Sequence, residues 1–305
     1  MVRILRLLDK LNQKTALVLD GGLATTLEGY GCDLNSSLWS SEVLINQPDK
    51  VMQAHQAFTD AGADIVLTST YQASFATFKA IGKEISEIEQ LFEIAVKNIK
   101  EAVTDDQVVV GSLGPYGAYL SDGSEYTGQY EISVDEYIQF HEERINALIN
   151  RGIYDFVFET VPNFNEIKAI VEYIIPNYSD HNTFWISCTV DNEGNLSDGT
   201  EFEKVCQYIV QHIGRVPVFG INCSSINSVE KAINKGLLEL PQVIALYPNG
   251  GKTFDPIEKV WIGKGENALL VQKTKEWIAQ GVQIIGGCCE TTPEDIKQIH
   301  EAIER

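Results

Sequence analysis

Three cysteines lie where their thiols could act together on one metal ion. Cys288 and Cys289 are adjacent and follow the apolar run 283–286, and Cys223 follows a second apolar run, 218–222. If both runs are strands that end at one edge of a sheet, the three thiols can bind one zinc ion and leave its fourth position open. An open zinc position can take a substrate thiol and favour its ionised form at neutral pH. The sequence therefore predicts a catalytic zinc site made of Cys223, Cys288 and Cys289.

The adjacent pair sets a condition on the backbone. Consecutive side chains of a strand point to opposite faces, so Cys288 and Cys289 can share an ion only if the chain turns between them. Gly286 and Gly287 precede the pair and are expected to supply the necessary conformational freedom. A helix beginning near Thr292 would also direct its positive N-terminal end toward nearby thiolates.

Other interpretations of the cysteines remain open at this point. A single cysteine at a strand end is often a small buried hydrophobic residue, and an adjacent pair could instead form a redox disulfide. The remaining cysteines, Cys32, Cys188 and Cys206, are expected to be packing residues. The five histidines show no H-E-x-x-H spacing, so none is assigned to a metal.

The composition is that of an ordinary folded protein with an acidic surface. The chain has 305 residues, of which 44% are hydrophobic, and its formal net charge is −20. Such a surface repels phosphate backbones, so nucleic acid is not an expected partner. Six cysteines are too few for a disulfide scaffold of this length.

The sequence gives no sign of a targeting or membrane segment. The first residues have neither a long apolar core nor a small-residue cleavage site, so no secretory signal is expected. No stretch reaches the roughly 18 apolar residues that a membrane span requires. We therefore expect a cytoplasmic protein without a membrane partner, in a compartment where cysteine clusters usually serve metal binding or catalysis.

Eight short apolar runs recur along the chain and are typical of strands buried on both faces of a parallel sheet. They are Ala16–Asp20, Ile65–Thr70, Val108–Gly114, Phe156–Glu159, Phe184–Val190, Val218–Asn222, Val243–Tyr247 and Gln283–Gly286. Helical patterns fill the intervals between them. Eight alternations predict an α/β fold, a (β/α)8 TIM barrel formed by one domain over residues 1–305. A doubly wound open sheet is the alternative.

Several helix boundaries are marked in the sequence. One helix is expected to begin at Pro48 and to end at Gly62. Ser133 and Glu136 form a capping-box pattern, Asn165 is expected to cap a helix through Ile174, and Thr292-Pro293 opens the last helix.

Segments outside the regular alternation are expected to lie at the two ends of the barrel. Near the N-terminus, Leu5, Leu8 and Leu11 fit a short amphipathic helix that could close the bottom of the barrel. Long inserts at 21–46, 71–80 and 115–132 follow the first three strands, so they should build the mouth of an active site. The last insert is rich in Gly, Tyr and Ser and could close over a ligand.

Short motifs along nearly the whole chain carry a family resemblance. They are Leu19-Asp-Gly-Gly-Leu-Ala24, Leu38-Trp-Ser40, Thr70-Tyr-Gln-Ala-Ser74, Gly111-Ser-Leu-Gly-Pro-Tyr-Gly-Ala-Tyr-Leu120, Phe158-Glu-Thr160, Gly220-Ile-Asn-Cys223 and Gly286-Gly-Cys-Cys-Glu-Thr-Thr-Pro293. With these motifs the chain resembles the homocysteine S-methyltransferase family. The segment 121–126 looks most like the branch that uses S-methylmethionine or S-adenosylmethionine.

The resemblance implies a (β/α)8 barrel whose zinc is held by Cys223, Cys288 and Cys289. It also implies a homocysteine pocket, in which the carboxylates of Asp20 and Glu159 accept hydrogen bonds from the substrate ammonium. A backbone N–H of the turn Gly21-Gly22 would bind the substrate carboxylate.

The aromatic residues Tyr71, Tyr116 and Tyr126 are looser candidates for the donor site, because aromatic faces can hold a sulfonium as they hold an ammonium. The expected reaction is zinc-dependent transfer of a methyl group from the sulfonium donor to the thiol of L-homocysteine, which gives methionine. The competing hypotheses are a thiol oxidoreductase that uses the adjacent cysteines and a barrel that binds zinc or thiols without catalysis. The sequence does not decide between a monomer and a dimer.

Overall fold

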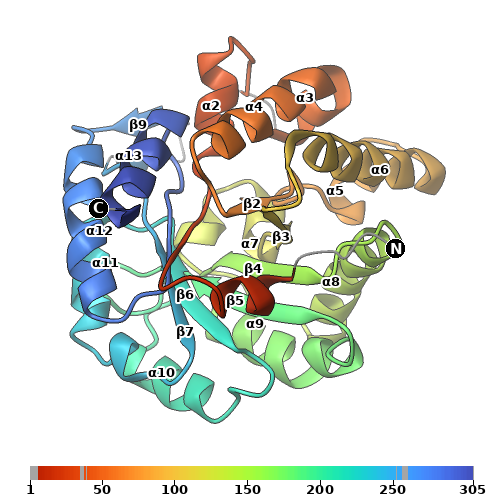
Figure 1. Cartoon of the computed structure of the whole chain (residues 1–305). Coiled ribbons are helices and arrows are strands. Elements are labelled where there is room, and N and C mark those ends of the chain that lie inside the picture. Colours follow the sequence, from red (N-terminus) through yellow and green to blue (C-terminus); the bar gives the residue numbers. More distant parts are fainter. Residues whose placement is uncertain (1–5, 35–37, 39, 252, 256–259, 305) are drawn as a thin grey trace.

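Eight parallel strands form the inner wall of a closed barrel (Figure 1). They are β1 (Leu17–Val18), β2 (Ile65–Leu67), β3 (Val108–Leu113), β4 (Asp155–Val161), β5 (Thr183–Cys188), β6 (Val218–Asn222), β7 (Val243–Tyr247) and β10 (Ile284–Ile285). Their order around the wall is β1-β10-β7-β6-β5-β4-β3-β2. A parallel bridge between Leu19 and Ile65 joins β1 to β2 and closes the ring. Each strand falls on one of the eight predicted runs, so the predicted barrel is confirmed.

The computed structural model describes residues 6–34, 38, 40–251, 253–255 and 260–304. Two residues used in the sequence analysis, Leu5 and Trp39, lie outside the described residues.

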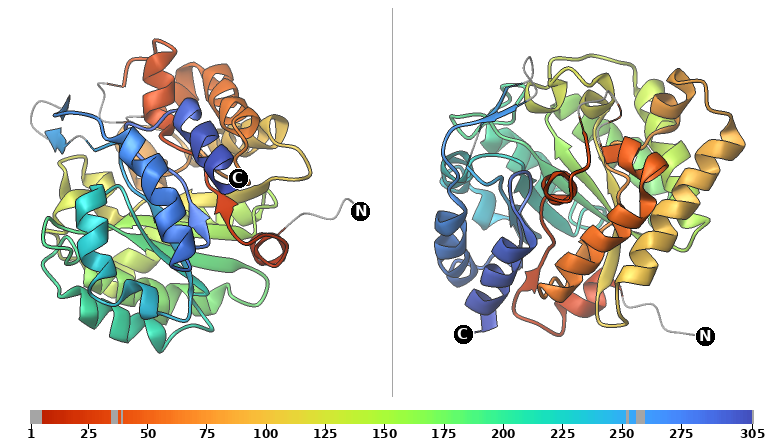
Figure 2. Two further views of the ribbon diagram at one scale, coloured as in Figure 1. Left: turned by 60° about the vertical axis from the view of Figure 1, so that its left-hand side comes forward. Right: turned by 90° about the horizontal axis from the view of Figure 1, so that it is seen from above.

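Helices surround the strands, as Figures 1 and 2 show from three directions. The outer ring is formed by α4 (Pro48–Asp60), α6 (Ile85–Ala102), α8 (Val134–Ile149), α9 (Phe164–Ala169), α10 (Phe202–Val210), α11 (Ile226–Ile233), α12 (Asn267–Ala279) and α13 (Pro293–Glu304). The last helix, α13, contacts α4, so the ring of helices closes as the strands do. The main hydrophobic core lies between the two rings and includes Phe58, Phe156, Ile186 and Trp277, all fully buried.

The helix boundaries test the predicted caps. The capping box of Ser133 and Glu136 is present at the start of α8, and Thr292 Oγ1 accepts a hydrogen bond from Asp295 N at the start of α13. The prediction that Asn165 caps the next helix was wrong. Asn163 is the cap, because its Oδ1 accepts hydrogen bonds from the N–H groups of Asn165 and Glu166. Helix α9 then continues through η2 (Ile170–Ile174) and η3 (Ile175–Asn177).

A short N-terminal helix, α1 (Leu7–Leu11), closes the bottom of the barrel. Its Lys10 pairs with Asp64, just before β2, at 3.3 Å, and Arg6 pairs with Asp155, at the start of β4, at 2.9 Å. Both partners stand at the N-terminal ends of strands, so this end of the barrel is covered. The predicted apolar face was wrong in one respect: Leu7 and Leu11 pack into the barrel, whereas Leu8 is 41% exposed.

The inserts after the first three strands contain helices that the sequence analysis treated as loops. They are α2 (Leu23–Gly29), α3 (Ser40–Asn46), α5 (Phe75–Ala80), α7 (Tyr116–Leu120) and η1 (Ser124–Tyr126). A short 3-10 helix, η4 (Leu237–Glu239), precedes β7. After β7, the strands β8 (Thr253–Asp255) and β9 (Val260–Ile262) form a hairpin at the rim of the barrel, and the sequence analysis did not predict this hairpin. An insert whose sequence shows no regular helical pattern can therefore still contain short helices.

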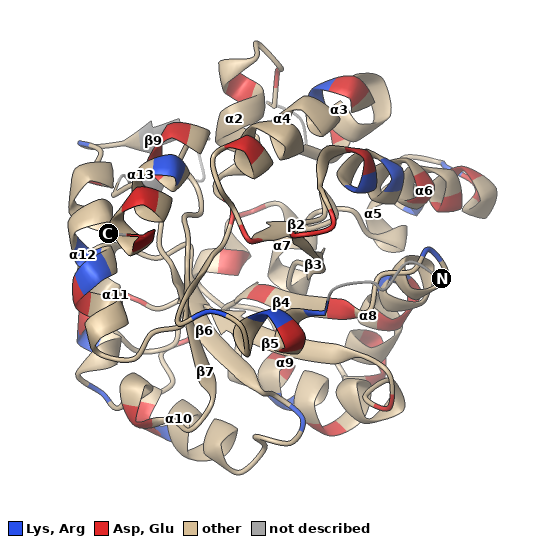
Figure 3. Cartoon of the chain, viewed as in Figure 1, with Lys and Arg blue, Asp and Glu red and all other residues tan. Residues whose placement is uncertain are grey.

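Charge is distributed over the outer helices. Figure 3 shows Asp and Glu on helices all around the ring, with Lys and Arg interspersed, rather than on one face. Among the described residues, no helix is long and apolar enough to cross a membrane.

Candidate active site

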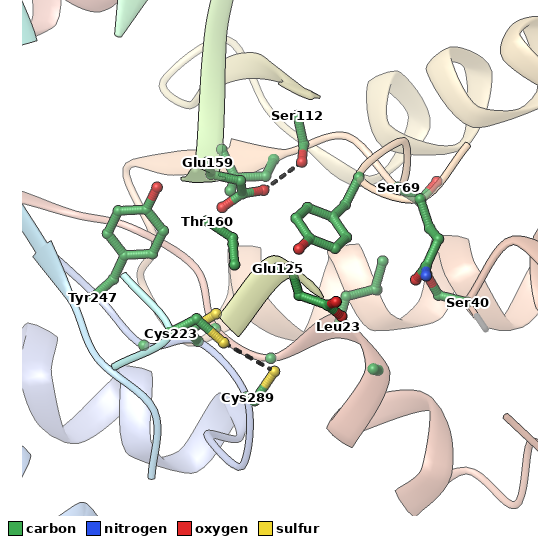
Figure 4. Close-up of a pocket in the computed structure, with 18 of the residues that line it drawn as sticks. Leu23, Ser40, Ser69, Ser112, Glu125, Glu159, Thr160, Cys223, Tyr247 and Cys289 are labelled. Atoms are coloured by element: carbon green, nitrogen blue, oxygen red, sulfur yellow. Dashed lines mark hydrogen bonds between the residues drawn. The ribbon is translucent and has the colours of Figure 1, made fainter. Parts of the chain in front are cut away.

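Three thiols meet at the C-terminal ends of β6 and β10. The sulfur atoms of Cys223, Cys288 and Cys289 all lie within 4.8 Å of one another, and Cys223 Sγ is 3.5 Å from Cys289 Sγ (Figure 4). Tetrahedral zinc–sulfur bonds of about 2.3 Å place their sulfurs roughly 3.8 Å apart, so this cluster fits one zinc ion. Hydrogen bonds from Cys288 and Cys289 lower the pKa of the Cys223 thiol well below its usual range.

The backbone brings the thiols together in two ways. Cys223 takes a left-handed conformation, with φ of 46°, immediately after β6, and this turns its side chain toward the pair. Neither Gly286 nor Gly287 has a positive φ, so the predicted use of their conformational freedom was wrong. Gly286 is needed instead for close approach, because a Cβ there would lie 2.7 Å from Leu19 Cβ.

The thiols face a cavity of about 1180 Å³, counting the open space at its mouth. Its lining comes from several strand ends and from the inserts: Asp20, Gly21, Gly22, Leu23, Ala24, Ser40, Leu67, Thr68, Ser69, Tyr71, Gln72, Ser112, Ser121, Gly123, Glu125, Tyr126, Glu159, Thr160, Cys223, Tyr247, Gly287, Cys288 and Cys289. Three carboxyl groups and three thiols line it, while none of these described lining residues is Lys, Arg or His. The cavity therefore suits cations: a metal ion, an ammonium or a sulfonium.

Two of the carboxyl groups, Asp20 and Glu159, stand at the ends of strands on different parts of the barrel wall. Asp20 Oδ2 accepts a hydrogen bond from the backbone N–H of Leu67 at 2.8 Å, and Glu159 accepts one from the hydroxyl of Ser112. Burial raises the pKa of Asp20 well above its usual range and that of Glu159 to about 7. A cationic ligand would favour the ionised form of both, which is the behaviour expected of groups that bind an ammonium.

The turn after β1 places Gly21 and Gly22 at the cavity wall. The N–H of Gly22 already donates to Thr291, at 3.1 Å to Oγ1 and 3.2 Å to the carbonyl oxygen. Within the described part of the chain, the N–H of Gly21 has no such acceptor. A side chain at Gly22 would meet Cys288 O at 2.6 Å, so this turn and the cysteine pair lie against each other.

The three tyrosines proposed for the donor site are not all brought together. Tyr71 and Tyr126 line the cavity, and Tyr126 Oη lies 3.5 Å from Cys223 Sγ. Tyr116 is not among the lining residues. Its ring packs instead in an aromatic cluster, with its centroid 5.3 Å from Phe140 and 5.9 Å from Tyr130, because α7 carries it to the outer side of the insert.

Several residues of the site were missed by the sequence analysis. Glu125 lines the cavity, and its Oε2 atom is buried with no hydrogen-bond partner among the described residues. Thr160 has a positive φ of 62° at the end of β4. Asn222 is fully buried beside it, and Tyr247 lies close to Glu159 (Figure 4). The signal for Asn222 and Thr160 was adjacency, since each follows or precedes a predicted site residue at a strand end.

A buried polar network lies behind the insert 115–132. Glu166 Oε1 accepts from the backbone N–H of Tyr116 at 2.9 Å and pairs with His141 Nε2 at 2.8 Å, while its other oxygen accepts from the hydroxyl of Tyr130. Arg144 joins His141 Nδ1 at 2.7 Å. Burial lowers the pKa of His141 to about 4, so its ring is neutral at pH 7. One carboxylate thus fastens both ends of the insert to the barrel.

Known proteins resemble this chain along its length. A family model described as homocysteine S-methyltransferase matches residues 17–303. The homocysteine S-methyltransferase YbgG of Bacillus subtilis (strain 168) is 36% identical over 295 residues, which are 93% of each chain. The homocysteine S-methyltransferase of Escherichia coli (strain K12) is 38% identical over 298 residues, 94% of each chain.

A solved structure shows the same similarity in three dimensions. The crystal structure of the metallated form of the homocysteine methyltransferase MmuM from Escherichia coli has a TM-score of 0.83 and 34% sequence identity. The match covers 95% of this chain and 97% of that one.

Proposed function

Because the chain belongs to the homocysteine S-methyltransferase family, we propose that it transfers a methyl group from a sulfonium compound to the thiol of L-homocysteine, forming methionine. The donor is S-methylmethionine or S-adenosylmethionine, and the reaction is zinc-dependent. The observation that carries the proposal is the meeting of three thiols and three carboxyl groups in one cavity that no described Lys, Arg or His lines.

The zinc ion would be held by Cys223, Cys288 and Cys289. The fit is supported by sulfur separations of at most 4.8 Å, by the lack of Lys, Arg or His among the described lining residues and by the match to a metallated structure. Zinc bound by three cysteines lowers the pKa of a thiol that takes its open position, so that thiol is ionised at neutral pH. The cavity wall beside Cys223 is formed by Tyr126, which limits the space for water next to the sulfur cluster.

Homocysteine would be oriented by groups at the strand ends. The carboxylates of Asp20 and Glu159 accept hydrogen bonds from its ammonium, and the N–H of Gly21, which no described residue accepts from, donates to its carboxylate. Leu67 N–H and Ser112 Oγ hold the two acidic side chains in place. With both ends of the amino acid fixed, its side chain can direct the thiol toward the cysteines.

The transfer itself needs alignment more than acid–base catalysis. The homocysteine sulfur forms a bond to the methyl carbon while the bond from that carbon to the donor sulfur breaks, and the electron pair stays on the donor sulfur. The donor leaves as a neutral thioether, so no general acid is required, and the thiol proton passes to solvent. Holding the two sulfurs in line can contribute roughly 7–11 kcal/mol to lowering the barrier.

A donor panel tests the proposal directly. Purified zinc-loaded protein is incubated with homocysteine and either S-methylmethionine, S-adenosylmethionine or glycine betaine, and methionine is measured. We expect methionine only with a sulfonium. Thiol titration with and without a chelator separates the rival oxidoreductase: bound zinc protects thiols until it is removed, whereas a disulfide yields thiols only on reduction. If the protein binds zinc but forms no methionine from any donor, the result favours the alternative of a barrel that binds zinc or thiols without catalysis.

A further inference from the structure

Glu125 is the charged residue of the cavity that the homocysteine site does not use. It lies in η1, within the insert after β3, and its side chain points into the cavity beside Leu23 (Figure 4). Its Oε2 is buried and has no hydrogen-bond partner among the described residues. A buried carboxylate oxygen without a partner is unfavourable, so its retention calls for a ligand.

The surroundings of Glu125 do not supply a counter-charge. The described residues that line the cavity include no Lys, Arg or His, and the other acidic groups there, Asp20 and Glu159, already accept hydrogen bonds from the protein. Burial raises the pKa of Glu125 to about 7, and the negative charges of Cys223 and Asp122 add to the effect. A cation that entered the cavity would therefore find one carboxylate with an oxygen that no described residue engages.

The backbone fixes where that carboxylate stands. Thr189, after β5, donates from Oγ1 to the carbonyl oxygen of Glu125 at 3.2 Å. The next residue, Tyr126, extends its hydroxyl to 3.5 Å from Cys223 Sγ, and Tyr71 lines the same part of the cavity. Glu125 and Tyr126 thus come from the insert after β3 and Tyr71 from the insert after β2, and all three line the cavity together with Cys223.

We propose that Glu125 is the residue that selects a positively charged methyl donor, by pairing its Oε2 with the sulfonium between the rings of Tyr71 and Tyr126. The inference rests on the proposed function and assigns the donor half of the same cavity. Aromatic faces and a carboxylate together favour a sulfonium over a neutral thioether of the same shape. The neutral thioether product loses this pairing, which assists its release.

The pairing has a particular kinetic signature. The positive charge on the donor sulfur disappears as the methyl group moves, so Glu125 stabilises the bound donor more than the transition state. Its loss should raise the donor KM without lowering kcat, since only interactions that strengthen in the transition state contribute to kcat. The homocysteine KM should not change.

The experiment uses a charged and a neutral ligand of nearly equal shape. Binding of S-methylmethionine and of its carbon isostere, 2-amino-5-methylhexanoic acid, to the zinc-loaded protein is measured by calorimetry in wild type and in Glu125→Gln. Both ligands carry the same ammonium and carboxylate, so their difference reports the sulfonium alone. Glu131→Gln is the matched control, because Glu131 is an exposed acid of the same insert that does not line the cavity.

We expect wild type and the Glu131→Gln variant to bind S-methylmethionine about tenfold more tightly than the isostere, a difference of about 1.4 kcal/mol. Glu125→Gln should bind both ligands equally, with an unchanged affinity for the isostere. Equal weakening of both ligands, or no change in either, would overturn the assignment. Failure of the proposed function and failure of this inference give different results. If the wild-type protein forms no methionine, the proposed function is wrong. If Glu125→Gln forms methionine with an unchanged donor KM, only this inference is wrong.

Discussion

The side-chain amide of Asn222 is hydrogen-bonded twice to Thr160, from the end of β6 to the end of β4. Its Oδ1 accepts from the backbone N–H of Thr160 at 2.7 Å, and its Nδ2 donates to Thr160 Oγ1 at 2.8 Å. The same Nδ2 lies 3.8 Å from Cys288 Sγ. One amide therefore stabilises the left-handed conformation of Thr160, next to Glu159, and also contacts the sulfur cluster.

Replacing this amide should disturb both halves of the site. We expect Asn222→Ala to lower the free energy of unfolding by about 1–3 kcal/mol, because the buried N–H of Thr160 loses its acceptor. It should also raise the homocysteine KM and weaken zinc binding, measured by competition with a chelator. Asn98→Ala is the control, since Asn98 donates to Pro48 O on the outer ring. A similar loss of stability in both variants, with normal zinc affinity in each, would assign Asn222 a structural role only.

The sulfur cluster should be needed for metal and for turnover. Cys288→Ser replaces a thiolate ligand by a hydroxyl that binds zinc weakly, so we expect zinc content well below one per chain and loss of methionine formation. Elemental analysis and the methionine assay measure both. Cys206→Ala should retain both properties, because Cys206 is buried in α10 and does not line the cavity. Full activity of a metal-free preparation would contradict the zinc-dependent mechanism.

Glu159 should affect homocysteine affinity and leave the metal in place. We expect Glu159→Gln to raise the homocysteine KM about tenfold to hundredfold, since a hydrogen bond to a charged group contributes roughly 1.5–3 kcal/mol. Zinc content should stay near that of wild type. The control is Glu172→Gln, where the exposed Glu172 accepts from Tyr208 on the outer surface. If the kinetics of Glu159→Gln are unchanged, the carboxylate does not bind the substrate.

The network under the insert should control the donor side. Tyr130→Phe removes the hydroxyl that donates to Glu166, so we expect a loss of about 1–3 kcal/mol in the free energy of unfolding and a higher donor KM. The homocysteine KM should remain as in wild type. Tyr208→Phe removes a tyrosine–glutamate bond of the same kind at the surface and should change stability by less than about 0.5 kcal/mol. A normal donor KM in Tyr130→Phe would show that the insert keeps its position without this bond.

A buried histidine should make stability depend on pH. His55 in α4 is 1% exposed, and neither ring nitrogen has a hydrogen-bond partner among the described residues. Burial lowers its pKa from 6.5 to about 4. The unfolded chain therefore binds a proton that the folded chain does not, and stability falls as the pH falls from 6.5 toward 4.

His55→Leu removes this difference. We compare the free energy of unfolding of His55→Leu with that of wild type, measured by urea unfolding at pH 7.5 and at pH 5.5. We expect this difference to shift in favour of the variant by roughly 1 kcal/mol at the lower pH. His212→Leu serves as the control, since His212 is a partly buried histidine whose Nδ1 lies 2.8 Å from Tyr208 O. Identical pH profiles of wild type and His55→Leu would mean that His55 is not buried neutral in solution.

Local sequence patterns predicted most of the fold because the strands are short, apolar and separated by strong helix signals. The runs Val218–Asn222 and Val243–Tyr247 match β6 and β7 residue for residue. The inserts could not be predicted in this way, since α5 and α7 are too short to show a clear period. The helix cap was misplaced because Asn163 and Asn165 both precede the apolar residues, and only the three-dimensional turn selects the first.

The site was predictable where one residue type carries the chemistry. The cysteines and the two acids at strand ends stand out in the sequence, but Glu125 is one of 43 acidic residues and lies in an irregular insert. Its significance depends on burial and on the absence of a partner among the described residues. The role of Gly286 likewise depends on its contact with Leu19, which lies far earlier in the chain.

The floor of the barrel has a kinetic consequence. Leu7 and Leu11 of α1, together with the side chains packed against them, fill the interior of the barrel below the cavity. Both reactants and both products must therefore pass through the mouth of the cavity at the other end. The amino acid seated at the strand ends lies beneath the one held by the covering insert. We expect a compulsory sequence of arrival, with the acceptor first, and product inhibition patterns in which the methionine made from it is the last to depart.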